Sequence, residues 1–115
     1  MKVIGLFKNA QKTISVPAGA VACEEGDVGE EMFGITDGAV ELRTTDRLID
    51  TLGPDDVFGE MAVVDQSPRM ATAIAIEDTT LAAVDRQRFL FLVHETPTFA
   101  LSVMSAMAAR LWSHT

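Results

Sequence analysis

Between residues 13 and 84, apolar residues recur in short segments with a period of two, and each segment ends at a turn rich in Gly, Pro, Asp or Glu. The segment Ala71–Ile76, with the sequence ATAIAI, is a clear example. Such segments are too short for ordinary helices, and their alternation is typical of strands with one buried face. A succession of short strands separated by turns predicts a β-sandwich or barrel.

Two turns in this region are expected to reverse the chain. Thr36-Asp37-Gly38 lies between two alternating segments, and an Asp-Gly pair tolerates the positive φ that a tight hairpin requires. We therefore predict a hairpin turn there. Glu77-Asp78 likewise predicts a turn after which the chain returns as a further strand.

The period changes to that of a helix after Asp85, which is a plausible N-cap. A second helix is predicted to begin at Thr96-Pro97, with the threonine as N-cap and the proline at the first helical position. The two predicted helices span about residues 86–95 and 97–113.

The predicted fold class is therefore α+β and mainly β, with a roll of strands over about residues 12–84 followed by two C-terminal helices. The chain has 115 residues, of which 48% are hydrophobic, so we expect a single domain spanning residues 1–115 with one core.

The composition also limits the setting in which the protein works. No apolar run approaches the roughly 18 residues that span a bilayer, and the N-terminus lacks the features of a signal peptide. Cys23 is the single cysteine, so no intrachain disulfide is possible, and we expect it to pack in a strand as a small hydrophobic residue. These features favour a cytoplasmic protein with no membrane association.

The charge is strongly acidic, with 17 acidic and 9 basic residues and a net charge of −8. Such a surface repels nucleic acids and anionic membranes, so we expect no direct nucleic acid binding. An anionic ligand would have to be held by a local cluster of donors, which draws attention to Arg69.

The predicted last helix, 97–113, is apolar around most of its circumference. A helix of this kind usually buries two faces. One face would pack on the strands, and the other predicts a contact with a partner protein or with a second copy in a homodimer.

The segment from Phe58 to Arg69 has the chemistry of an anion site. Gly59 lets a ligand approach the backbone closely, and a helical turn over Met61–Val64 would present free N–H groups to an anion. Arg69 can bind a phosphate through two hydrogen bonds, and the carboxylate of Glu60 can accept hydrogen bonds from sugar hydroxyls. Together these groups fit a ribose phosphate. The alternative is that Glu60 and Arg69 form a salt bridge on a loop.

Two longer motifs carry a family resemblance. EGDVGEEMFGITDGAV (residues 25–40) resembles the first signature of cyclic nucleotide-binding domains. LGPDDVFGEMA (52–62), followed by SPRMAT (67–72), resembles their phosphate-binding cassette. The motifs have the order and separation usual for the family, and the resemblance extends over roughly residues 12 to 115.

The resemblance implies an eight-stranded β-roll, a jelly-roll-like barrel, followed by the two helices. It implies that Gly59 with the following amides and Arg69 hold the cyclic phosphate, and that Glu60 binds the ribose 2′-hydroxyl. The ligand-binding residues that it implies are Phe58, Gly59, Glu60, Met61, Ala62, Arg69, Met70, Ala71 and Thr72. The last helix would lie over the base, where His114 and Thr115 are further candidates for base contacts, and in the catabolite-activator type it also forms the dimer.

This sequence departs from the family pattern in three places. The residue after the arginine is often Ala, Ser or Thr, but here it is Met70, and the loss of a hydroxyl favours cAMP over cGMP. The segment before the first strand is short for the family. Relatives that regulate transcription continue into a helix-turn-helix domain where this sequence ends, so the resemblance is to a stand-alone domain.

We therefore expect a sensor module that binds cAMP, or less favourably cGMP, as its ligand, requires no cofactor, and relays occupancy through its last helix. Two alternatives remain: a nucleotide-free interaction or dimerisation domain of the same fold, and a sensor of another small effector. No catalytic set is visible, so we do not expect an enzyme. His94 and His114 lie in the predicted helices and cannot converge inside the roll, so no metal site is expected.

Overall fold

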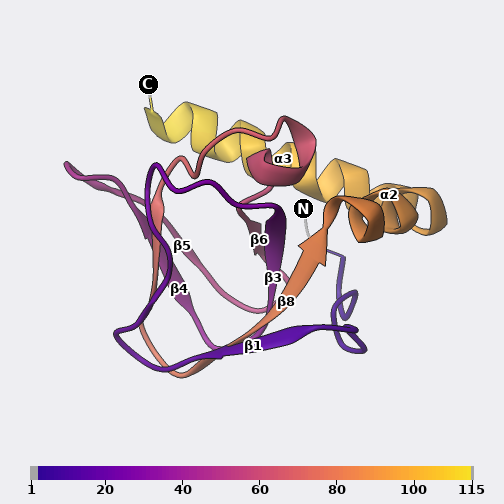
Figure 1. Ribbon diagram of the computed structural model, residues 1–115, viewed down its shortest axis with the longest axis horizontal. Helices are drawn as coiled ribbons and strands as arrows, with labels where there is room; N and C mark the ends of the chain where they lie inside the picture. The colour runs from indigo at the N-terminus through magenta and orange to yellow at the C-terminus, as the bar shows by residue number, and fades with distance from the viewer. Residues whose placement is uncertain (1–2, 115) are drawn as a thin grey trace.

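The computed structural model describes residues 3–114, with side chains through residue 111 (Figure 1). Its elements in chain order are β1 (Thr13–Val16), β2 (Val21–Cys23), β3 (Glu31–Asp37), β4 (Val40–Arg43), β5 (Leu48–Leu52), β6 (Val57–Phe58), α1 (Met61–Val64), β7 (Thr72–Ala75), β8 (Thr79–Asp85), α2 (Arg86–Glu95) and α3 (Pro97–His114).

The eight strands form two antiparallel four-stranded sheets. The strand order is β1-β8-β3-β6 in one sheet and β2-β7-β4-β5 in the other. This is the double-sheet arrangement of a jelly roll. The predicted eight-stranded roll with two C-terminal helices is confirmed, but the sheets do not close into a barrel, because each ends in edge strands within the described part of the chain.

The prediction of a hairpin turn at Thr36-Asp37-Gly38 is wrong. Gly38 has the expected positive φ of 99°, but β3 and β4 lie in different sheets, so the chain crosses between the sheets there. The turn at Glu77-Asp78 makes a second crossing, from β7 to β8. Alternation shows which face of a strand is buried, but it does not show which strand is its partner.

The two crossings lie side by side and are joined by Thr79. The Thr79 hydroxyl makes two hydrogen bonds to the Ala39 backbone. It accepts from the Ala39 amide at 3.2 Å and donates to the Ala39 carbonyl at 3.1 Å. A Cβ on Gly38 would overlap the same hydroxyl. Glycine is therefore required at this corner for space as well as for conformation.

The core has two parts. One lies between the two sheets and includes Phe33, Ile35, Val40, Phe58 and Leu81. The other lies between the β1-β8-β3-β6 sheet and the helices and includes Phe7, Met32, Val63, Leu92 and Phe99. Residues on both faces of β3 and β8 are consequently buried, and the helices sit against the outer face of this sheet (Figure 1).

The two helices begin where the sequence predicts. Asp85 caps α2, since its Oδ1 accepts a hydrogen bond of 2.8 Å from the Arg88 amide. Pro97 is the first residue of α3, and the Phe99 amide donates to the Thr96 carbonyl at 2.8 Å. Among the described helices, none is by itself long and apolar enough to cross a membrane, although α2 and α3 meet that criterion as a pair bent by 119°.

Phe99 fixes α3 to the rest of the fold. Its side chain is fully buried, and its ring packs edge-on against Phe7 at 6.2 Å and against Phe89 at 5.7 Å between ring centroids. These contacts connect α3 to α2 and to the segment before β1.

We predict that Phe99→Ala lowers the free energy of unfolding by about 3–5 kcal/mol, because it leaves a cavity among rings that cannot collapse into it. Urea denaturation followed by circular dichroism measures the change. The control is Thr98→Ala at the neighbouring exposed position, with an expected change within about 0.5 kcal/mol. A loss of less than about 1 kcal/mol for Phe99→Ala would show that α3 is held elsewhere.

Candidate functional site

A cavity of about 420 Å³ lies between the strands and α3. Segments far apart in the sequence meet around it. It is lined by Cys23, Leu42, Ile49, Phe58, Gly59, Glu60, Met61, Ala62, Pro68, Arg69, Met70, Ala71, Met107, Ala108, Arg110 and Leu111. A volume in this range suits a small organic ligand.

Most residues of the predicted cassette line this cavity. These are Phe58, Gly59, Glu60, Met61, Ala62, Arg69, Met70 and Ala71. Thr72 is not among the lining residues of the described chain, and its hydroxyl accepts a hydrogen bond of 3.0 Å from the Glu25 amide instead. The side chain of His114 and all of Thr115 lie outside what the structure describes.

Arg69 is held in place by the loop between β2 and β3. Its amide donates to the Asp27 carbonyl at 2.8 Å, and its carbonyl accepts from the Gly26 amide at 2.7 Å. Its side chain points inward, and the residue is only 9% exposed. Nη1 donates to the carbonyls of Glu31 at 2.6 Å and Gly59 at 3.2 Å.

Two glycines make room for the Arg69 guanidinium. A Cβ on Gly29 would overlap Nη2, and a Cβ on Gly59 would lie 2.6 Å from Nη1. The guanidinium carbon also lies 5.3 Å from the centre of the Phe33 ring, at cation–π distance. Any side chain at position 29 would therefore push the guanidinium out of its seat.

The charge of Arg69 is not neutralised by any carboxylate in the described ion pairs. Its described partners are carbonyl oxygens, which are dipoles and not charges. Buried charges in proteins are normally paired, because the cost of removing them from water is large. The seat of Arg69 thus has the electrostatics of an anion site.

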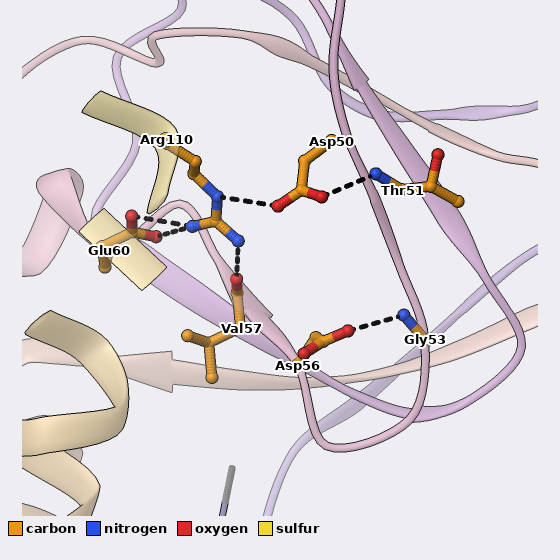
Figure 2. Close-up of polar contacts among 7 residues, drawn as sticks. All are labelled: Asp50, Thr51, Gly53, Asp56, Val57, Glu60 and Arg110. Carbon is orange, nitrogen blue, oxygen red and sulfur yellow. Dashed lines mark hydrogen bonds and ion pairs between the residues drawn. The ribbon is translucent and has the colours of Figure 1, made fainter. Parts of the chain in front are cut away.

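Glu60 is paired with Arg110 of α3 (Figure 2). Arg110 Nη1 donates to Oε1 at 2.8 Å and to Oε2 at 2.9 Å, and the side chains are 6% exposed for Glu60 and 13% exposed for Arg110. The alternative interpretation of the sequence predicted a salt bridge between Glu60 and Arg69. That prediction is wrong, because the partner of Glu60 is Arg110. Arg110 also donates through Nη2 to the Val57 carbonyl.

The predicted helical turn is present as α1, but its amides are less free than the sequence suggested. The Ala62 amide donates to the Gly59 carbonyl at 3.2 Å, and the Val63 amide donates to the Glu60 carbonyl at 3.1 Å. The Arg86 guanidinium donates to the Val63 carbonyl at 2.6 Å and closes the other end of the turn. The Ala62 and Val63 amides are therefore not free to bind an anion.

The rest of the cavity is apolar. Leu42 and Ile49 contribute from β4 and β5, and Met107, Ala108 and Leu111 contribute from α3. A flat ring of low polarity fits such walls, and the charged lining residues are Glu60, Arg69 and Arg110. Among the described residues, no group of three or more His, Cys, Asp and Glu side chains is placed to hold a metal ion.

The most important residue that sequence reasoning missed is Arg110. It is the only charged residue between Pro97 and Leu111, and a single charge in an apolar helix could have been taken as a sign of a buried partner. Nothing in the sequence spacing identifies Glu60, 50 positions away, as that partner. Cys23 was expected in a strand, where it lies, but its place in the cavity wall was not foreseen.

Known proteins resemble the chain in both sequence and structure. A family model for the cyclic nucleotide-binding domain matches residues 13–96. The cyclic AMP receptor protein of Thermus thermophilus is 35% identical over 100 residues, covering 83% of this chain and 46% of that protein. A cyclic nucleotide-gated potassium channel of Rhizobium etli is 37% identical over 95 residues, covering 83% of this chain and 26% of the channel.

Among solved structures, the crystal structure of the Thermus thermophilus catabolite activator protein matches with a TM-score of 0.76 at 32% identity. The match covers 90% of this chain and 51% of that one. The chain thus spans about half the length, or less, of these relatives.

Cys23 provides a probe inside the cavity wall. Burial raises the pKa of its thiol, and the positive charge of Arg69 only partly offsets this effect. We predict that iodoacetamide alkylates Cys23 at least about tenfold more slowly in the folded chain than in urea at pH 8, because the thiolate is the reactive form. Mass spectrometry of the single adduct measures both rates.

The same shift has a consequence for stability. The folded state holds the thiol proton more tightly than the unfolded state, so the stability contributed by this proton is complete below the unfolded pKa. It is lost as the pH rises through the folded pKa.

For the alkylation experiment, equal rates in the folded and unfolded chains would contradict the burial of Cys23.

Proposed function

Because the chain belongs to the cyclic nucleotide-binding domain family, we propose that the cavity binds a 3′,5′-cyclic nucleotide and that the chain is a non-catalytic sensor of that ligand. The observation that carries the proposal is the buried Arg69 guanidinium, which has no carboxylate partner among the described ion pairs and faces the same cavity as Glu60. A cyclic phosphate supplies the single negative charge that this seat lacks.

The ligand would use the two ends of the cavity differently. Arg69 holds the phosphate through the N–H groups that do not bond to the carbonyls of Glu31 and Gly59. Glu60 accepts a hydrogen bond from the ribose 2′-hydroxyl. The apolar walls of the cavity cover the base.

The same walls favour cAMP over cGMP. The base end presents no hydroxyl or amide side chain among the described residues, and Met70 takes the place of a hydroxyl after the arginine. Guanine carries an exocyclic oxygen and amino group that would lose their water without gaining partners there. Adenine lacks the exocyclic oxygen, so fewer of its polar groups lose water and the desolvation cost of its binding is smaller.

Calorimetric titration of the purified protein with cAMP and cGMP tests the proposal. We expect about one cAMP per chain, weaker binding of cGMP, and a loss of cAMP affinity of at least about 100-fold in Arg69→Ala, because charge-assisted hydrogen bonds to the phosphate are removed. Undiminished binding by Arg69→Ala would overturn the assignment of the phosphate site. A different small molecule retained by the purified protein would favour the other-effector alternative.

A matched pair of variants tests whether the position of the Arg69 guanidinium, and not only its charge, is needed for binding. Gly29→Ala keeps the arginine but fills its seat, so it should weaken cAMP binding. Gly53→Ala adds the same methyl group where no atom lies within 4 Å, so it should leave binding unchanged. Equal effects of the two variants would show that the seat does not matter.

We also propose that occupancy is relayed through α3 to a second copy of the chain. Four residues with the 3-4-3 spacing of a coiled-coil seam form an exposed stripe on α3: Leu101, Met104, Ala108 and Leu111. Ala108 and Leu111 also line the cavity, so a helix packed on this stripe lies next to the ligand. The ligand and the dimer would then share one element.

Sedimentation equilibrium with and without cAMP tests this relay. We expect a reversible dimer whose dissociation constant changes when cAMP binds, and an increase of at least about tenfold in that constant for Met104→Lys, which buries a charge in an apolar seam. Thr98→Lys, at an exposed position outside the stripe, serves as the control. A monomer at the highest concentration reached would contradict the dimer, and a dimer that binds no nucleotide would favour the interaction-domain alternative.

A further inference from the structure

Arg110 has a second carboxylate within reach. Figure 2 shows its guanidinium between Glu60 on one side and Asp50 on the other. Nε lies 3.8 Å from Asp50 Oδ2, which is an ion-pair distance but too long for a hydrogen bond. Nε is also buried and has no hydrogen-bond partner. The guanidinium is therefore fully bonded toward Glu60 and incompletely bonded toward Asp50.

There is space for Arg110 to move toward Asp50. A second cavity of about 130 Å³ lies beside α3, and both Arg110 and Asp50 line it. Arg110 is thus part of the wall between this cavity and the larger one. A shift of about 1 Å would bring Nε to hydrogen-bond distance from Asp50 Oδ2.

Asp50 is prepared to accept this contact. It lies on β5, with its side chain 37% exposed, so its charge is partly hydrated. Its Oδ1 accepts a hydrogen bond of 2.9 Å from the Thr51 amide, which fixes the carboxylate and leaves Oδ2 toward Arg110.

We propose that Asp50 is the alternative partner of Arg110, and that Arg110 passes from Glu60 to Asp50 when a ribose hydroxyl bonds to Glu60. The inference rests on the proposed function, because it concerns the group that the hydroxyl must displace. Asp50 is a positioning residue here, since it lines the smaller cavity and acts on the ligand through Arg110.

The need for an alternative partner follows from burial. Both Glu60 oxygens already accept a hydrogen bond from Arg110 Nη1, so a ribose hydroxyl that bonds to Glu60 shares the carboxylate with Arg110 and weakens its hold on the guanidinium. A buried arginine that loses its carboxylate carries a large desolvation penalty. The Asp50 carboxylate removes this penalty and thereby lowers the cost of ligand binding.

The experiment compares cAMP with 2′-deoxy-cAMP on the wild-type chain and on Asp50→Asn, by calorimetry. Asparagine keeps the oxygen that accepts from the Thr51 amide but removes the charge that Arg110 needs. We expect Asp50→Asn to lower the affinity for cAMP by about three- to fivefold, the upper part of the range for a partly exposed ion pair. The affinity for 2′-deoxy-cAMP, which cannot displace Arg110, should change by less than about twofold.

The control is Asp46→Asn, which removes the same charge from the exposed turn between β4 and β5 and should change neither affinity. An equal loss for both nucleotides in Asp50→Asn, or no loss for either, would overturn the inference while leaving the proposed function intact. If the wild-type chain binds neither nucleotide, the proposed function fails and the inference fails with it.

Discussion

The ion pair between Glu60 and Arg110 determines where α3 lies on the roll. Through residue 111 the helix is otherwise uncharged, so Arg110 adds the one charged contact to the packing of Phe99. Arg110 meets a buried carboxylate on the loop between β6 and α1 and a carbonyl of β6, so only one register of the helix satisfies both. A register that separated the pair would leave an uncompensated buried charge, which is strongly destabilising. The larger cavity has a defined wall because this pair is made.

The two arginines of the site have opposite electrostatic situations. Arg110 is matched by Glu60, whereas Arg69 is surrounded by carbonyl oxygens and by the space that Gly29 and Gly59 leave. The chain as a whole carries a net charge of −8, so its general field repels anions. A local, buried and unmatched cation is the arrangement that can still select one. The proposed phosphate site thus has a local charge opposite to the overall charge of the molecule.

The sequence predicted the parts of this structure that depend on local chemistry. Period-two segments indicated the strands, Asp85 and Pro97 indicated the starts of the helices, and the turn after Gly59 indicated α1. Sequence reasoning failed where distant segments decide the outcome. The hairpin expected at Asp37-Gly38 is a crossing between sheets, because strand pairing depends on the whole sheet. The contact of Glu60 with Arg110 could not be inferred for the same reason, since it depends on how α3 packs.

The strand order also governs how the chain reaches this structure. β8 lies between β1 and β3, and β7 lies between β2 and β4, so neither sheet can be completed before the strands that end at residues 75 and 85 are available. Strands that are distant along the chain pair slowly, because the entropy of loop closure is lost before any strand contact forms to offset it. As the chain emerges from the ribosome, its first strands have unpaired edges and apolar faces that are open to aggregation. The larger cavity is complete only when α3 and Arg110 are in place, so its walls depend on segments from β2 to α3.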